Sequence, residues 1–168
     1  MRLPDAEAVL KDLTQKIRSD TGKDFSLVGI HTGGVWLAER LHQELGIKQP
    51  LGTLDVAFYR DDFDKIGLHA QVKPSEIPFA VEGAHILLVD DVLQTGRTIR
   101  AAINELFDYG RPASISLAAL VDRGGRELPI AAQYTGITLE LPADKMLELK
   151  HGKNGKLSLH LYDKNLPE

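Results

Sequence analysis

Four consecutive apolar residues, 86–89 (Ile-Leu-Leu-Val), are followed at once by two aspartates, and this is the most constraining feature of the sequence. An apolar run bounded by polar residues is typical of a strand buried on both faces of a parallel sheet. Residues 99–107 then repeat apolar side chains at helical spacing, before Gly110 and Pro112 end the pattern. The segment predicts a buried strand, a loop over residues 90–98 and an amphipathic helix.

The same alternation of strand and helix recurs along the chain. Helical spacing and strand-forming runs predict two further helices, over residues 5–20 and 38–45, and three further strands, over residues 25–30, 51–59 and 115–121. This order indicates an α/β domain with a mainly parallel sheet flanked by helices. The tail differs, because leucines alternate with polar residues on both sides of a Gly-Lys-Asn-Gly turn at residues 152–155. That pattern predicts a C-terminal β-hairpin.

The chain length predicts one domain. Domains typically hold about 100–200 residues, and the chain has 168, so we expect a single domain over residues 1–168. Residues 60–83 carry many charges and two prolines with little periodicity. A loop of that length inside a compact domain is often functional, and we predict a flexible loop there.

Composition excludes several classes of protein. The chain has no cysteine, which rules out disulfides, Cys-ligated zinc, iron–sulfur clusters and thiol nucleophiles. Its net charge of -4 argues against a protein that binds nucleic acid through a large excess of positive charge. The longest apolar stretch, residues 117–121, is far shorter than the roughly 20 residues of a membrane span. We expect a cytoplasmic protein without a membrane partner.

The segment that joins the predicted strand and helix suits a phosphorylated sugar. Ligands of parallel sheets bind outside the carboxyl ends of the strands, and a helix N-terminus attracts anions. Thr95 and Thr98 add hydroxyl donors, and Gly96 permits close approach of the backbone. Asp90 and Asp91 repel phosphate but accept hydrogen bonds from vicinal sugar hydroxyls. The pattern predicts a ribose-5-phosphate site; the alternative is that the aspartates cap the helix and the threonines form turns.

Residues 86–98 resemble the phosphoribosyl-pyrophosphate (PRPP) signature of the type I phosphoribosyltransferases, in which four apolar and two acidic residues precede a Thr-Gly-x-Thr loop. Segments 28–34, 54–62, 110–112 and 121–130 together resemble one subfamily. That subfamily is the PyrR family of bacterial pyrimidine-operon regulators that are also uracil phosphoribosyltransferases. The resemblance covers nearly the whole chain. It implies a type I phosphoribosyltransferase-like fold with a small hood over about residues 122–136.

The resemblance also implies a function. It implies a glycosyltransferase of pyrimidine metabolism that converts uracil and PRPP to UMP and pyrophosphate with Mg²⁺ as cofactor. It further implies transcription regulation through an mRNA leader in response to UMP or UTP, and a homodimer or larger homo-oligomer. Basic side chains in the first helix and the tail are balanced by acidic ones, so charge alone does not support the RNA partner. Two alternatives stay open: a non-catalytic UMP- or UTP-sensing regulator, and a phosphoribosyltransferase for another base.

Individual residues take roles from the same resemblance. Asp90 and Asp91 are the expected ribose ligands and, through water or ribose hydroxyls, the indirect ligands of Mg²⁺; with Arg60 in the flexible loop they form the expected catalytic set. The residues expected to bind PRPP or nucleotide are Thr32, Gly33, Gly34, Asp90, Asp91, Val92, Leu93, Gln94, Thr95, Gly96, Arg97 and Thr98. The expected base contacts in the hood are Asp122, Arg123 and Arg126. For the two arginines, a surface salt bridge is the alternative to base or RNA contact.

Gly33 departs from the pattern of the family, whose best-known pyrophosphate loop has arginine at this place. An arginine fork matches pyrophosphate oxygens, whereas glycine offers only its backbone. We therefore expect weaker PRPP affinity and turnover unless His31 or Arg60 compensates, and hypothesise that Gly33→Arg raises the rate. Trp36, which follows closely, is expected to pack in the core.

Overall fold

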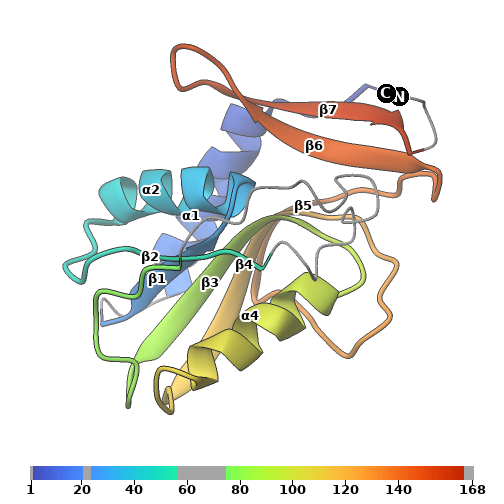
Figure 1. The fold of residues 1–168 in the computed structure, drawn as a ribbon. Coiled ribbons are helices and arrows are strands. Elements are labelled where there is room, and N and C mark those ends of the chain that lie inside the picture. Colours follow the sequence, from blue (N-terminus) through green and yellow to red (C-terminus); the bar gives the residue numbers. More distant parts are fainter. Residues whose placement is uncertain (1, 21–23, 57–74, 165–168) are drawn as a thin grey trace.

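The computed structural model describes residues 2–20, 24–56 and 75–164 (Figure 1). Its centre is a parallel sheet with the strand order β2-β1-β3-β4-β5. These strands are β1 (Ser26–Ile30), β2 (Gly52–Leu54), β3 (His85–Leu93), β4 (Ser114–Asp122) and β5 (Tyr134–Thr138). A separate antiparallel hairpin is formed by β6 (Lys145–His151) and β7 (Leu157–Asp163). The predicted parallel sheet and C-terminal hairpin are confirmed.

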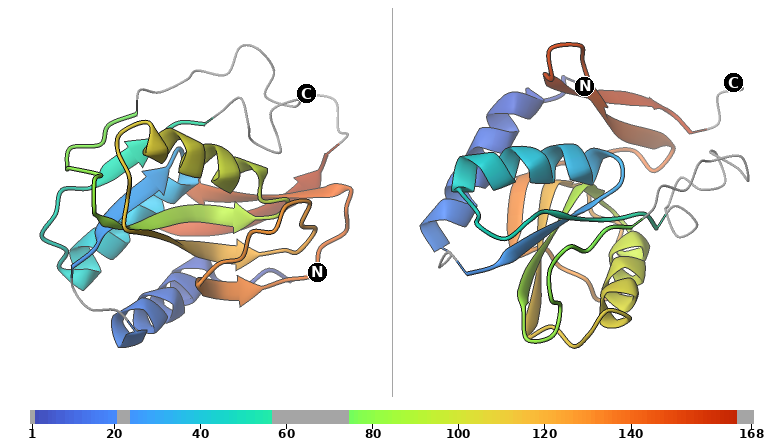
Figure 2. Two further views of the ribbon diagram at one scale, coloured as in Figure 1. Left: turned by 90° about the horizontal axis from the view of Figure 1, so that it is seen from below. Right: turned by 60° about the vertical axis from the view of Figure 1, so that its left-hand side comes forward.

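Within the described residues, three helices cover the two faces of the sheet. They are α1 (Ala6–Asp20), α2 (Gly33–Leu45) and α4 (Arg97–Phe107), and each matches a helix that the sequence predicts. Figure 1 and the two views of Figure 2 show α1 and α2 on one face and α4 on the other. Among the residues that the structure describes, no helix is long and apolar enough to cross a membrane.

The two faces explain the uninterrupted apolar run of β3. Successive side chains of a strand point to opposite faces of its sheet. Leu87 and Leu120 belong to the core beneath α1 and α2, whereas their neighbours Leu88 and Ala119 belong to the core beneath α4. All four residues are at most 3% exposed. Because helices cover both faces, no position in the middle of these strands favours a polar residue.

Strand β3 is longer than the sequence predicts. It continues through both aspartates to Leu93, so the segment before α4 is only residues 94–96. Pairing with β4 supplies the reason, because Val92 is in register with Val121 and Leu93 with Asp122. The predicted loop over residues 90–98 is therefore wrong in its first half. Two polar side chains at the end of a sheet do not interrupt backbone pairing.

Two other strands also differ from their predictions. The strand predicted over residues 51–59 is only β2, Gly52–Leu54, and residues 57–59 lie outside the described part of the chain. The sequence does not predict β5, because this edge strand is only half-buried and has no apolar run. It begins inside the segment predicted as the hood, residues 122–136, which otherwise contains the end of β4 and the loop after it.

Only part of the predicted flexible loop, residues 60–83, is described. The start of residues 75–83 lies beside β2, where the backbones of Thr53 and Glu76 exchange two hydrogen bonds of 2.8 Å. Val81 is buried in the core beneath α4. Residues 60–74 lie outside the described ranges, so the flexibility of the loop stays a prediction.

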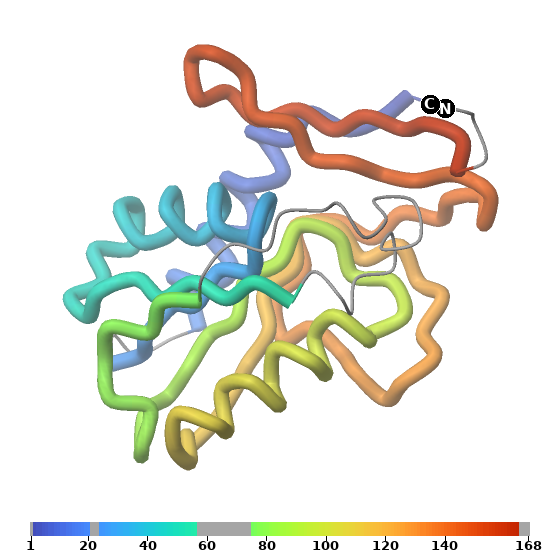
Figure 3. Tube along the Cα trace, viewed as in Figure 1, coloured from blue at the N-terminus to red at the C-terminus, as the bar shows by residue number. Residues whose placement is uncertain are grey.

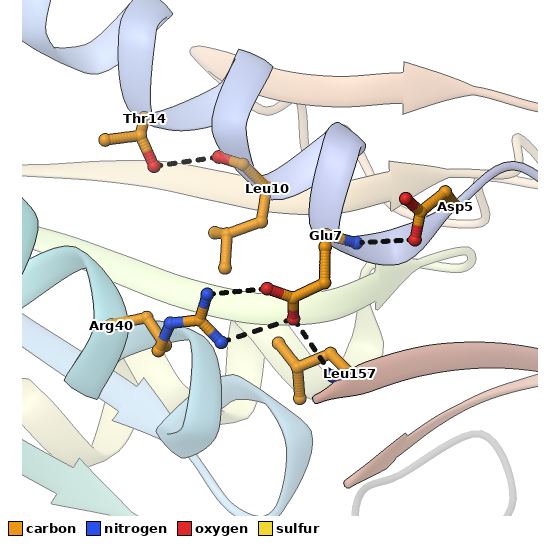
Figure 4. A network of polar contacts seen from close by, with 6 residues as sticks. All are labelled: Asp5, Glu7, Leu10, Thr14, Arg40 and Leu157. Atoms are coloured by element: carbon orange, nitrogen blue, oxygen red, sulfur yellow. Dashed lines mark hydrogen bonds and ion pairs between the residues drawn. The ribbon is translucent and has the colours of Figure 1, made fainter. Parts of the chain in front are cut away.

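The hairpin is attached to both helices of the first face. Its leucines at positions 147, 149, 157 and 159 are buried in the core with α1 and α2. Glu7 on α1 accepts two hydrogen bonds from the Arg40 guanidinium on α2, of 2.7 and 3.2 Å, and one of 2.9 Å from the backbone N–H of Leu157 (Figure 4). One carboxylate therefore joins α1, α2 and β7. Figure 3 shows how this brings the start of the chain beside the hairpin.

Glu7→Gln is expected to lower the free energy of unfolding at neutral pH by about 1 kcal/mol, because it removes a partly shielded ion pair. The hydrogen bond from Arg40 holds the pKa of Glu7 below its ordinary value of 4.5. A carboxylate with a depressed pKa stabilises the fold above its unfolded pKa, and this contribution is lost as the pH falls through its folded pKa. Urea unfolding of the wild type and of Glu7→Gln should therefore show a difference in the free energy of unfolding. This difference should become smaller as the pH falls below 4.5, the ordinary pKa of glutamate.

Glu127→Gln is the matched control for this experiment. Glu127 also pairs with an arginine, Arg97, but both side chains are more than half exposed. Exposed pairs contribute little, so this variant should unfold like the wild type. An effect of Glu7→Gln that is equally large in strong acid, or matched by the control, would contradict the interpretation.

Candidate functional site

A pocket of about 420 Å³ lies between the carboxyl ends of the parallel strands and the hairpin. Its floor consists of the end of β1, the start of α2, residues of β3 and the first turn of α4: Ile30, His31, Thr32, Gly33, Trp36, Asp90, Asp91, Val92, Gln94 and Thr98. Its roof consists of Arg123 and hairpin residues: Met146, Leu147, Glu148, Leu149, Tyr162 and Lys164. This is the edge at which open parallel sheets bind their ligands.

Most of the residues predicted to bind PRPP or nucleotide meet in this pocket. Those that line it are Thr32, Gly33, Asp90, Asp91, Val92, Gln94 and Thr98. The other five, Gly34, Leu93, Thr95, Gly96 and Arg97, do not. The Leu93 side chain is 1% exposed in the apolar core, and the Arg97 guanidinium pairs with Glu127 at 2.9 Å. Arg60 lies outside the described residues.

The two aspartates are held at the end of β3 by short local hydrogen bonds. Asp90 Oδ1 accepts from the backbone N–H of Asp91 at 2.9 Å, and Asp91 Oδ1 accepts from that of Val92 at 2.8 Å. The N-cap of α4 is Gly96 and makes no side-chain capping bond. The alternative in which the aspartates cap this helix is therefore wrong. Both carboxylates instead line the pocket.

Two helices begin at or beside the pocket, and the N-cap residue of neither makes a side-chain capping bond. The N-caps are Thr32 for α2 and Gly96 for α4. Gly96 has a φ of 93°, a conformation that favours glycine. Thr95 Oγ1 accepts from the backbone N–H of Arg97 at 3.2 Å, which shapes the turn into α4. Helix N-termini of this kind favour anions through their N–H groups and dipole.

Glycines bring the start of α2 into contact with the sheet. A Cβ at Gly34 would lie 2.4 Å from the carbonyl oxygen of Val89, and a Cβ at Gly29 would lie 2.8 Å from the carbonyl oxygen of Gly34. Both obstacles are backbone atoms, which cannot rotate away. At Gly33 the obstacle is different, since a Cβ there would lie 2.3 Å from Oδ2 of Asp91. The first turn of α2 therefore touches both β3 and its aspartate.

The three predicted base contacts have different surroundings. Arg123 is 8% exposed, lines the pocket and donates to the carbonyl oxygen of Pro142 at 3.0 Å. Arg126 donates to Asp122 at 2.6 Å and to the carbonyl oxygens of Ile130 and Gln94. Burial alone would raise the pKa of Asp122, but hydrogen bonds from Arg126 and Gly124 outweigh it and hold the pKa below its ordinary value. Arg126 thus fastens the loop after β4 to the segment before α4, and neither it nor Asp122 lines the pocket.

Sequence reasoning misses the roof of the pocket. Nothing in the alternating pattern of the hairpin distinguishes Met146, Glu148 or Tyr162 from ordinary surface residues, because their approach to β3 depends on how the hairpin is attached. Trp36 packs against the core as predicted, yet it also lines the pocket and stacks on His151, with ring centroids 5.1 Å apart. Its position one turn after the predicted pyrophosphate loop is the one signal that could have indicated this.

The carboxylates of the pocket suit a metal that is held largely by its substrate. Within residues 2–20, 24–56 and 75–164 there is no group of three or more His, Cys, Asp or Glu that could hold a metal ion. Mg²⁺ commonly keeps several waters and binds one or two carboxylates together with substrate phosphates. Asp90 and Asp91 fit that arrangement, and they do not form a metal cage of their own.

Comparison with known proteins adds an independent finding. A family model described as "Phosphoribosyl transferase domain" matches residues 2–146. A "Bifunctional protein PyrR" of Pseudomonas aeruginosa is 53% identical over 153 residues, which cover 89% of this chain and 90% of that protein. The protein of the same name from Pseudomonas syringae pv. syringae is 48% identical and covers 97% of both chains. That from Nitrosococcus oceani is 55% identical over 82% of this chain and 78% of its own length.

Solved structures share the fold at lower identity. A hypoxanthine phosphoribosyltransferase from Staphylococcus aureus superimposes with a TM-score of 0.61 at 23% identity, over 80% of this chain and 73% of its own. A purine phosphoribosyltransferase from Pyrococcus horikoshii superimposes with a TM-score of 0.62 at 26% identity, over 80% and 83%. The sheet and its helices therefore follow a known architecture.

Gly34→Ala is expected to lower the free energy of unfolding by about 1–3 kcal/mol, the range for overpacking a filled interior. The added methyl group meets the Val89 carbonyl oxygen, so α2 must move away from β3. Thermal or urea unfolding measures the change. Gly152→Ala is the matched control, because its Cβ meets only an ordinary contact at 3.4 Å. Equal stability of the two variants would contradict the close packing of α2.

Proposed function

This chain belongs to the phosphoribosyltransferase family and, within it, to the bifunctional PyrR proteins, and from that premise we propose that it is a uracil phosphoribosyltransferase that also regulates pyrimidine genes. One observation carries the catalytic half of the proposal. The fold gathers two adjacent carboxylates, a helix N-terminus and a threonine of a second helix around one pocket. These groups are complementary to the ribose and phosphates of PRPP.

In the proposed complex, the ribose 5-phosphate of PRPP binds between β3 and α4. Asp90 and Asp91 accept hydrogen bonds from the 2′- and 3′-hydroxyls, because ionised carboxylates are strong acceptors and are already oriented by local bonds. The 5′-phosphate lies at the N-terminus of α4, with the hydroxyls of Thr95 and Thr98 and the backbone around Gly96 as donors. Arg97 adds positive charge nearby, although its guanidinium pairs with Glu127.

In the same proposed complex, the pyrophosphate group of PRPP binds at the N-terminus of α2. Thr32, Gly33 and Gly34 offer backbone N–H groups and the positive end of the helix dipole. His31 lines the same side of the pocket. Arg60 is proposed to close over PRPP with its loop, as the family resemblance implies.

The reaction needs positioning and charge stabilisation rather than a covalent nucleophile. Bond cleavage at C1 of the ribose develops positive charge on the ring and negative charge on the departing pyrophosphate. Asp90 and Asp91 hold the ring in place for attack by the base, and their charge favours the positive ring. Mg²⁺, when bound with PRPP, supplies charge neutralisation of the pyrophosphate.

We propose that uracil binds between the hairpin and the aspartates. Met146 and Tyr162 supply apolar surface for a planar ring, and Arg123 supplies a buried positive charge at the same wall. Arg126 and Asp122 support this wall without lining it. Arg123 is accordingly the predicted base contact that the pocket geometry favours.

The regulatory half of the proposal concerns RNA. UMP or UTP bound in the same pocket would alter affinity for an mRNA leader of a pyrimidine operon, with the protein as a homodimer or larger homo-oligomer. The test is the binding of such a transcript with and without UMP, at several salt concentrations because phosphate contacts are salt-dependent. Equal affinity in all nucleotide conditions would contradict regulation while leaving the enzyme intact.

Asp90→Asn and Asp91→Asn are each expected to lower kcat/KM for UMP formation from uracil and PRPP by about 10²-fold, a typical loss for a group that stabilises developing charge. The assay measures UMP in the presence of Mg²⁺, with hypoxanthine and guanine offered in parallel. Asp12→Asn, an exposed change on α1, should keep full activity. A folded wild-type protein that forms no UMP, or prefers a purine base, would overturn the proposed reaction.

Arg123→Gln and Arg126→Gln are expected to separate base binding from loop support. Arg123→Gln should raise the KM for uracil about tenfold, because one hydrogen bond from a charged group is lost. Arg126→Gln should mainly lower the unfolding temperature, because three hydrogen bonds that fasten the loop are removed. If Arg126→Gln changes the KM for uracil without a change in stability, the assignment of roles is reversed.

A further inference from the structure

The first turn of α2 and the second aspartate of β3 share one small space. An ideal Cβ at Gly33 would lie 2.3 Å from Oδ2, 2.8 Å from Cγ and 3.1 Å from Cβ of Asp91. The whole Asp91 side chain therefore lies against the Cα of Gly33. Both residues line the pocket, so the contact occurs inside the candidate site.

Asp91 is also held from its other side. Its Oδ1 accepts the backbone N–H of Val92 at 2.8 Å, and its own N–H donates to Asp90 at 2.9 Å. The carboxylate is thus confined between the β3 backbone and the bare backbone of Gly33. Any side chain at position 33 must displace it, and displacement breaks the alignment with the Val92 N–H.

The contact between Gly33 and Asp91 differs from the contact that Gly34 makes with β3. At Gly34 the obstructing atom is the Val89 carbonyl oxygen, so a side chain there moves the helix. At Gly33 the closest atoms belong to the end of a side chain that can rotate. A side chain at Gly33 therefore leaves the backbone in place and reorients Asp91. Alanine also favours helix over glycine, so the substitution does not weaken α2 by itself.

We propose that Gly33 is a positioning residue for the ribose-binding carboxylate: it lacks a side chain because Asp91 occupies that space. This inference rests on the proposed function for the role of Asp91. It also reverses the earlier hypothesis, since Gly33→Arg should lower the rate by moving Asp91 rather than raise it.

The experiment measures binding of UMP, which contains the ribose and 5′-phosphate but no pyrophosphate. Trp36 is the only tryptophan of the chain and lines the pocket, so its fluorescence reports binding, with equilibrium dialysis of labelled UMP as a second method. The proteins are the wild type, Gly33→Ala, Asp91→Ala and the double variant. Gly152→Ala is the matched glycine control outside the pocket.

Gly33→Ala should raise the Kd for UMP about tenfold in the wild-type background, the loss expected when one hydrogen bond to a charged group is misaligned. In the Asp91→Ala background the same change should have an effect of less than about twofold, because sites coupled through one contact are not additive. Unfolding temperatures should show the same coupling: Gly33→Ala lowers the midpoint clearly when Asp91 is present and much less when Asp91 is alanine, because only the contact with the Cβ of residue 91, at 3.1 Å, then remains.

Three outcomes would overturn the inference. One is an equal effect of Gly33→Ala in both backgrounds. Another is unchanged UMP binding with a loss confined to pyrophosphate or PRPP, which would make Gly33 only a backbone ligand of the leaving group. The third is a gain of rate in Gly33→Arg. Wild-type protein that binds no UMP would contradict the proposed function instead, and the unfolding measurements would still decide whether Gly33 and Asp91 are coupled.

Discussion

The close contact between the first turn of α2 and the ends of β1 and β3 is the constraint on which the site depends. Gly29 and Gly34 have no side chains at positions where backbone atoms lie within 3 Å of an ideal Cβ. The helix can therefore begin directly against the strand that carries the aspartates. Without this contact the N-terminus of α2 and the carboxylates of β3 would not face one pocket. All of the chemistry proposed for the site thus depends on the close packing of a few backbone atoms.

The roof of the pocket depends on a second set of interactions at the other end of the sequence. The hairpin forms its own two-stranded sheet, and it reaches the pocket because its leucines join the core of α1 and α2. Glu7, Arg40 and the Leu157 N–H add a polar contact where α1, α2 and β7 meet. Trp36 and His151 add a stacked pair beside the pocket. The N-terminal helix thereby contributes to a site that contains none of its residues.

The aspartates show how strand geometry serves binding. As members of β3 they have a fixed backbone, paired with β4, and each carboxylate is further oriented by a backbone N–H. Strand neighbours point to opposite sides, so the two adjacent carboxylates enter the pocket in different directions. Asp91 meets Gly33 and Asp90 lies deeper, with only 7% of its surface exposed. A loop, as the sequence predicts for these residues, would hold them less firmly.

The sequence by itself determined the α/β class, the helices, the buried central strands and the hairpin, because these follow from local periodicity and turn residues. It also marked Asp90, Asp91 and Thr98, since the PRPP-like pattern of residues 86–98 is continuous in the chain, and the family resemblance marked the segment 32–34. The extension of β3 to Leu93, the edge strand β5 and the roof of the pocket came only from the tertiary structure. They depend on pairing with β4 and on burial against α1 and α2, which connect residues far apart in the chain. The contact of Gly33 with Asp91 belongs to the same class: the sequence shows a glycine at position 33, and only the fold shows that Asp91 lies against it.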